Sequence, residues 1–111
     1  MTDNEALDQV AAQYSSIHSQ FTALLGACQT PEQRSALGNV IMDAHDNYVH
    51  AQRLFFEQNS AAVQTIGKAA EQTQKSVDQS LADLKNISKT LDDITSAVKI
   101  VTQVAAVFVQ L

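Results

Sequence analysis

Three side chains of the kind that bind metal ions lie close together near the middle of the sequence. Asp43, Asp46 and His50 are spaced i, i+3 and i+7, which places them on one face of a helix. A hairpin with the preceding helix would bring His18 within about one turn of His45. Carboxylate-bridged di-iron bundles use Glu together with Glu-x-x-His, and the sequence lacks that motif. The cluster also lies off the main apolar stripe, so we interpret it as a solvated face and predict no metal site.

The sequence shows no arrangement for covalent catalysis either. Cys28 is not accompanied by a Cys/His/Asn constellation, and no serine stands in a Gly-x-Ser-x-Gly motif. A glycine-rich phosphate loop is also absent. Cys28 ends an apolar face beside a loop, where it is expected to pack as a small hydrophobic residue. We therefore predict that the chain is not an enzyme and binds no cofactor.

The composition favours a few long helices over a sheet. Of the 111 residues, 45% are apolar but only 5% aromatic, and three Gly and one Pro give few turn signals. A net charge of −5 argues against a nucleic-acid partner, because phosphate binding needs a basic surface. The single cysteine allows no internal disulfide, and residues 1–6 lack the regions of a signal peptide. We predict a cytoplasmic protein, with secretion without a cleavable signal peptide as the alternative.

Two helices are expected over residues 4–28 and 31–58. In the first, apolar residues recur at alternating spacings of 3 and 4 and define one helical face: Leu7, Val10, Tyr14, Ile17, Phe21, Leu24 and Cys28. Thr30 is a suitable N-cap before Pro31, and Gln33 would complete a capping box with Thr30. Because the loop between the helices is short, the pattern predicts an antiparallel hairpin.

The second helix is apolar over a broad arc. Its main stripe consists of Leu37, Ile41, Ala44, Tyr48, Ala51 and Phe55. Further apolar residues lie beside this stripe, namely Val40, Met42, Val49, Leu54 and Phe56. A helix with so broad an apolar surface usually contacts more than one neighbour. The pattern is interrupted near residues 57–61, where Asn59 or Ser60 can cap a new helix.

A third, long helix is expected over residues 60–111. Its a positions are Val63, Ala70, Val77, Leu84, Leu91, Val98 and Ala105, and its d positions are Ile66, Thr73, Ser80, Ile87, Ile94, Val101 and Phe108. The first helix is only about half as long and cannot cover it. Either this segment breaks near residues 86–90 and folds back into a four-helix bundle, or another chain packs on it. Small or apolar residues at e and g favour a bundle of three or more helices over a two-stranded coiled coil.

The apolar residues of the second half of this segment form the predicted interaction seam: Val77, Leu81, Leu84, Ile87, Leu91, Ile94, Val98, Val101, Val104, Phe108 and Leu111. Residues 97–111 carry a single charge, Lys99. Three interpretations of 97–111 stay open: a helix buried in a bundle or oligomer, an element that contacts a membrane interface, and the start of a core that continues in a longer protein.

The length, the hairpin and the acidic composition resemble the small helical-hairpin substrates of bacterial type VII secretion. Leu25-Gly26-Ala27 stands where those proteins have Trp-x-Gly, and a Tyr-x-x-x-Asp/Glu tail is absent. The polar heptads and the apolar patch resemble helical pore-forming toxin components, again without a specific motif. Neither resemblance assigns a family.

We predict a single all-α domain over 1–111, an antiparallel hairpin plus a long heptad-patterned helix, completed as a bundle or coiled coil by oligomerisation. The predicted function is a non-enzymatic interaction or assembly module that packs its apolar seams against a second copy or a partner helical protein. The alternative is a membrane-active or secreted toxin-like component that uses residues 97–111.

Overall fold

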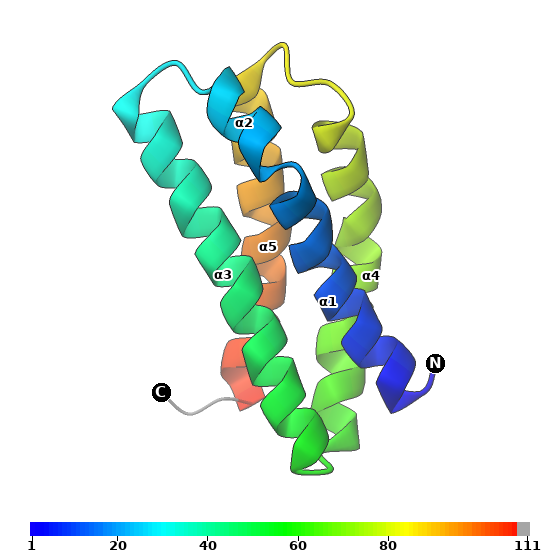
Figure 1. Ribbon diagram of the computed structural model, residues 1–111. Helices are drawn as coiled ribbons and strands as arrows, with labels where there is room; N and C mark the ends of the chain where they lie inside the picture. The colour runs from blue at the N-terminus through cyan, green and yellow to red at the C-terminus, as the bar shows by residue number, and fades with distance from the viewer. Residues whose placement is uncertain (109–111) are drawn as a thin grey trace.

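Five helices and no strand make up residues 1–108, the part of the chain that this computed structural model describes. They are α1 (Asp3–Ser19), α2 (Phe21–Ala27), α3 (Pro31–Phe56), α4 (Ser60–Leu81) and α5 (Ile87–Phe108). The all-α prediction is therefore confirmed. The helix expected over 4–28 is interrupted at Gln20, so that the short α2 follows α1 across one end of the bundle (Figure 1).

Side-chain caps explain where α3 and α4 begin. The Thr30 hydroxyl accepts a hydrogen bond from Gln33 N at 3.1 Å, and Pro31 opens α3, as the sequence predicts. The Gln33 side chain closes the loop differently, because its Oε1 accepts from Gln29 N at 2.6 Å. Asn59 caps α4 by accepting from Ala62 N at 3.2 Å, and this turn lies within the interruption expected at 57–61.

The segment expected as a long helix over 60–111, with a possible break near 86–90, forms two helices within the described residues. The chain turns at residues 82–86, which overlap at Asn86 with the range 86–90 where a fold-back was expected. Asp83 Oδ1 accepts from Lys85 N at 2.9 Å, and Asn86 Oδ1 accepts from Lys89 N at 3.2 Å. The Thr90 hydroxyl donates to the Asp83 carbonyl at 3.3 Å. These local side-chain bonds satisfy backbone groups that a continuous helix would pair, so they stop α4 and start α5 without Gly or Pro.

The four long helices form a bundle in which like-directed helices are neighbours (Figure 1). α1 packs beside α3 and α4, and α5 also packs beside α3 and α4, so α3 and α4 lie diagonally across the bundle. α1 and α4 run parallel, as do α3 and α5. The expected antiparallel pairing of the first two long helices is present in α1 and α3. The third segment folds back and supplies the fourth long helix, which is the four-helix bundle expected as one of the two alternatives.

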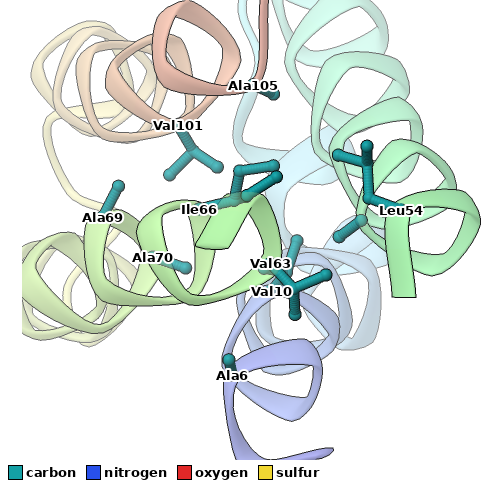
Figure 2. Close-up of a cluster of buried hydrophobic side chains, with 11 residues drawn as sticks. Ala6, Val10, Leu54, Val63, Ile66, Ala69, Ala70, Val101 and Ala105 are labelled. Atoms are coloured by element: carbon teal, nitrogen blue, oxygen red, sulfur yellow. The ribbon is translucent and has the colours of Figure 1, made fainter. Parts of the chain in front are cut away.

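Two buried hydrophobic clusters fill the two halves of the bundle. Figure 2 shows the first, at the end of the bundle where α1 begins, with Val10, Leu54, Ile66 and Val101 converging from four helices. The second, nearer α2, is formed by Ile17, Leu24, Leu37, Val40, Ala44, Val77, Ile87, Leu91, Ile94, Ala97 and Val98. Most a and d positions expected for the third segment are buried in one of these clusters. The heptad phase was therefore right on both sides of the turn, although the helix is not continuous.

Buried polar residues lie between the two clusters on α1, α3 and α4, namely Gln13, Asn47 and Thr73. Gln13 on α1 donates from Nε2 to the Thr73 hydroxyl on α4 at 2.8 Å. Asn47 on α3 donates from Nδ2 to the Val98 carbonyl on α5 at 3.3 Å, and its Oδ1 accepts from the Thr102 hydroxyl at 3.1 Å. Each parallel pair of helices is thus joined by a buried hydrogen bond, which fixes its register because a slip would leave these groups unpaired.

Candidate functional site: the outer face of helix α3

The predicted interaction seam lies mainly inside the bundle. Six of its members are buried: Val77, Ile87, Leu91, Ile94, Val98 and Val101. Four more are half-buried and pack against the two clusters: Leu81, Leu84, Val104 and Phe108. Leu111 lies outside the described residues. The structure therefore brings the described part of the seam together as the core of the bundle, where α1 and α3 cover it, in line with the fold-back alternative.

Several apolar side chains of the C-terminal segment are also buried in the core of the bundle. Of residues 97–108, Ala97, Val98, Val101 and Ala105 are buried, whereas Ile100 and Val107 are exposed on the outside of α5. Within residues 1–108, none of the helices combines the length and the apolar character that crossing a bilayer requires. Residues 109–111 of the predicted membrane-contacting segment lie outside the described part.

The residues considered for a metal site are spread over the surface. Asp43 and Asp46 are exposed and His50 is half-buried. The Tyr14 ring lies between the two other histidines, with ring centroids 5.4 Å from His18 and 5.2 Å from His45. In the described part of the chain, no group of three or more His, Cys, Asp or Glu side chains is placed to hold a metal ion. Cys28 is half-buried and packs against the second cluster.

The perturbed carboxyl groups hold helices together near the ends of the bundle. Asp3 on α1 accepts hydrogen bonds from Gln64 Nε2 at 2.8 Å and the Ser60 hydroxyl at 2.7 Å, and both bonds lower the pKa of Asp3. On α5, Asp93 pairs with Lys89 at 2.8 Å, and the hydrogen bond from Lys89 lowers the pKa of Asp93. These groups connect α1 to α4 and stabilise α5, and we assign them a structural role.

A stripe of exposed apolar side chains runs along the outer face of α3. Met42 is 64% exposed, Val49 44% and Phe56 76%. The three residues are seven apart, which is about two helical turns, so they lie on one line about 21 Å long. We call Met42, Val49 and Phe56 the α3 stripe. The sequence placed these residues beside the core stripe, but the structure buries only their companions Val40 and Leu54.

An apolar groove adjoins the Met42 end of the stripe. It lies between α1, α2 and α3, and its walls are formed by Tyr14, His18, Phe21, Ile41, Met42, His45 and Asp46. Tyr14, Phe21 and Ile41 are half-buried, so their exposed edges give the groove an apolar floor. Aromatic and aliphatic side chains around a shallow depression are the usual lining of a site that receives an apolar side chain.

Charged residues of opposite sign lie beside the stripe, and the first of them, Asp46, also lines the groove, with Oδ1 3.9 Å from His45 Nδ1. Asp46 and Arg53 are seven residues apart and both exposed, so they lie on the same side of the line through Met42, Val49 and Phe56. On the opposite flank lie His45 and Gln52. Gln52 Nε2 donates to the Tyr48 hydroxyl at 3.1 Å, one turn earlier on the same helix. The outer face of α3 thus combines an apolar centre with polar edges.

Sequence reasoning missed this site because it treated every apolar residue of α3 as part of one widened core. The signal available was the exact repeat of seven from Met42 to Phe56, separated from Leu37, Ala44 and Ala51 by about half a turn.

Comparison with known proteins leaves this site to be interpreted from its own geometry. No protein-family model matches the chain. No curated protein matches it, and no solved structure does.

Proposed function

We propose that the chain is a non-enzymatic helical interaction module that binds another protein through the outer face of α3. The observation that supports this proposal is the α3 stripe, in which three large apolar side chains stay exposed while the rest of the heptad pattern is used in the core. Aromatic and Met side chains are enriched at protein interfaces, and charged residues are typical of the interface rim. The single half-buried Cys28 is compatible with action in the cytoplasm.

This proposal differs from the sequence-based hypothesis in the surface used. The predicted seam over residues 77–111 is mostly buried within the chain, so binding through it would require the bundle to open. Binding through α3 leaves both hydrophobic clusters intact. It also needs no conformational change beyond side-chain adjustment at the surface, which is common for preformed interfaces.

Site-specific photocrosslinking in the cells that express the protein tests this proposal. A benzophenone amino acid is placed at Val49 in the α3 stripe, and the control carries it at Gln72, an exposed position on α4. We expect a light-dependent adduct of higher mass from position 49 and none from position 72. Absence of any protein adduct from position 49 would exclude the α3 face as a protein-binding surface.

Vesicle flotation separates the proposal from the membrane-active alternative. We expect the purified chain to stay with the soluble fraction when mixed with vesicles of anionic and neutral phospholipid. Co-flotation of the chain that is lost on replacing Ile100 and Val107 by Ser would instead support the membrane-active function, because these two residues are the large exposed apolar side chains of α5.

A further inference from the structure

The pattern of the α3 face is self-complementary about Val49. Met42 lies seven residues before Val49 and Phe56 seven residues after it. In an antiparallel pair of α3 helices centred on Val49, Met42 of each copy therefore lies opposite Phe56 of the other. The two Val49 side chains meet at the centre, and the apolar line of one copy is matched along its whole length by that of the other.

The charged residues Asp46 and Arg53 also match in this antiparallel pair. Asp46 lies three residues before Val49 and Arg53 four residues after it, so in the pair they differ in height by only about 1.5 Å. A twofold axis that relates two antiparallel helices keeps each flank beside the same flank of the other copy. Asp46 of one copy consequently lies beside Arg53 of the other, and this happens twice.

In the same antiparallel pair, the groove near Met42 of one copy would lie opposite Phe56 of the other, the most exposed side chain of the stripe. Phe56 is 76% exposed, and its ring meets that of Phe55 edge-on at a centroid distance of 5.7 Å. Within the stripe, Phe56 lies nearest to the flank that carries His45, because Phe56 and His45 are eleven residues apart, or about three turns. His45 also lines the groove. The twofold arrangement therefore directs Phe56 of each copy toward the groove of the other.

From these three matches we infer that the partner of the α3 face is a second copy of this chain, joined in an antiparallel twofold dimer centred on Val49. The inference rests on the proposed function and names its partner. An isologous interface requires a self-complementary surface, whereas binding to a different protein would not. Three apolar residues and one groove per copy form a small interface, so the dimer is expected to be weak and to depend on concentration.

Charge exchange between Asp46 and Arg53 tests the inference in the purified full-length chain, with the dimerisation constant measured by sedimentation equilibrium. Asp46→Arg places two arginines together in each contact, and Arg53→Asp places two aspartates together. We expect each single variant to weaken dimerisation by about tenfold. The double variant Asp46→Arg/Arg53→Asp restores the opposite pairing and should return to within about threefold of the wild-type constant. An equimolar mixture of the two single variants should form mixed dimers.

Two further variants show whether a weaker dimer results from the changed net charge or from loss of folding. Lys99→Asp changes the net charge by the same amount as Arg53→Asp on the outer face of α5, and we expect it to leave dimerisation unchanged. Phe56→Ser should abolish dimerisation while retaining the helical circular dichroism spectrum, because the side chain is exposed.

Three results would overturn the inference: a wild-type chain that stays monomeric at all concentrations, single variants as tight as wild type, or a double variant as weak as the single ones. The photocrosslinking at Val49 distinguishes this failure from that of the proposed function. An adduct with a different protein, together with a monomeric purified chain, overturns the self-pairing but retains α3 as the binding face.

Discussion

The backbone of Gly67 on α4 lies directly against Ala6 on α1. A Cβ atom added at Gly67 would come within 2.6 Å of the Ala6 Cβ and 2.7 Å of the Ala6 carbonyl oxygen. Ala6 belongs to the first hydrophobic cluster, and Gly67 is buried beside it. The parallel helices α1 and α4 can approach this closely because Gly67 has no side chain.

Gly67→Ala should therefore destabilise the fold although alanine is the better helix former. The added methyl group meets backbone atoms of Ala6 that cannot move without shifting α1, and such overpacking costs about 1–3 kcal/mol. Gly38→Ala is the matched control, since a Cβ there meets no atom within 4 Å, and it should stabilise by about 0.5–1 kcal/mol. Urea denaturation measures both. A Gly67→Ala chain at least as stable as wild type would contradict the close approach of α1 and α4.

Removing the buried Thr73 hydroxyl should cost more than removing an exposed one from the same helix. Thr73→Val keeps the shape but leaves Gln13 Nε2 without the acceptor it has at 2.8 Å, at a cost of about 1–3 kcal/mol. Thr65→Val, at an exposed site on α4, should change stability by less than about 0.5 kcal/mol. The double variant Gln13→Leu/Thr73→Val should be closer to wild type than Thr73→Val alone. Additive effects in this cycle would show that the two side chains are not coupled.

Asn86→Ala should weaken the start of α5. The Asn86 carboxamide accepts from Lys89 N at 3.2 Å, and loss of such a cap costs about 1 kcal/mol. Asn86→Asp retains an acceptor and should stay within a few tenths of a kcal/mol of wild type. Thermal unfolding followed by circular dichroism measures the difference. Equal melting temperatures for the Ala and Asp variants would mean that Asn86 does not cap the helix.

The Asp3 carboxylate should make the junction of α1 and α4 sensitive to acid. Hydrogen bonds from Gln64 and Ser60 hold the pKa of Asp3 below its ordinary value of 3.8. Its ionised form therefore stabilises the fold above pH 3.8, and this stabilisation is lost as the pH falls through the folded-state pKa. NMR titration of the carboxyl carbon should give a midpoint below 3.8 that rises in Gln64→Leu/Ser60→Ala. An unchanged midpoint in that variant would exclude these bonds as the cause.

Heptad spacing predicted which residues of the third segment are buried but not whether its helix is continuous. Val63 and Ile66 before the turn, and Leu91 and Ile94 after it, all occupy the core positions expected for them. A seam that folds back on its own chain and a seam that meets another chain carry the same repeat. The turn itself lacks Gly and Pro, and its sequence signal is the pair Asp83 and Asn86, whose side chains accept from Lys85 N and Lys89 N.

The polar residues of the core could not be found from periodicity. Gln13 and Asn47 are buried at 2% and 3% exposure, although the apolar faces expected for their helices run through the neighbouring Tyr14 and Tyr48. Burial of each amide is tolerated because its side chain is hydrogen-bonded to a partner on another helix. Gln13 bonds to Thr73, and Asn47 bonds to Val98 and Thr102. Such pairing depends on which helices become neighbours. The α3 stripe was missed for a related reason, since the sequence does not say how much of a broad apolar arc the neighbouring helices cover.

The contact between Ala6 and Gly67 joins positions separated by about 60 residues, and this separation bears on how the chain folds as it is synthesised. A self-contained hairpin of α1 and α3 could complete its packing as soon as both helices had left the ribosome. Here α1 reaches its closest neighbour only after α4 has emerged, and α5 must follow before either hydrophobic cluster is closed. Closing long loops slows folding. The nascent chain therefore carries exposed apolar surface until α5 has been translated.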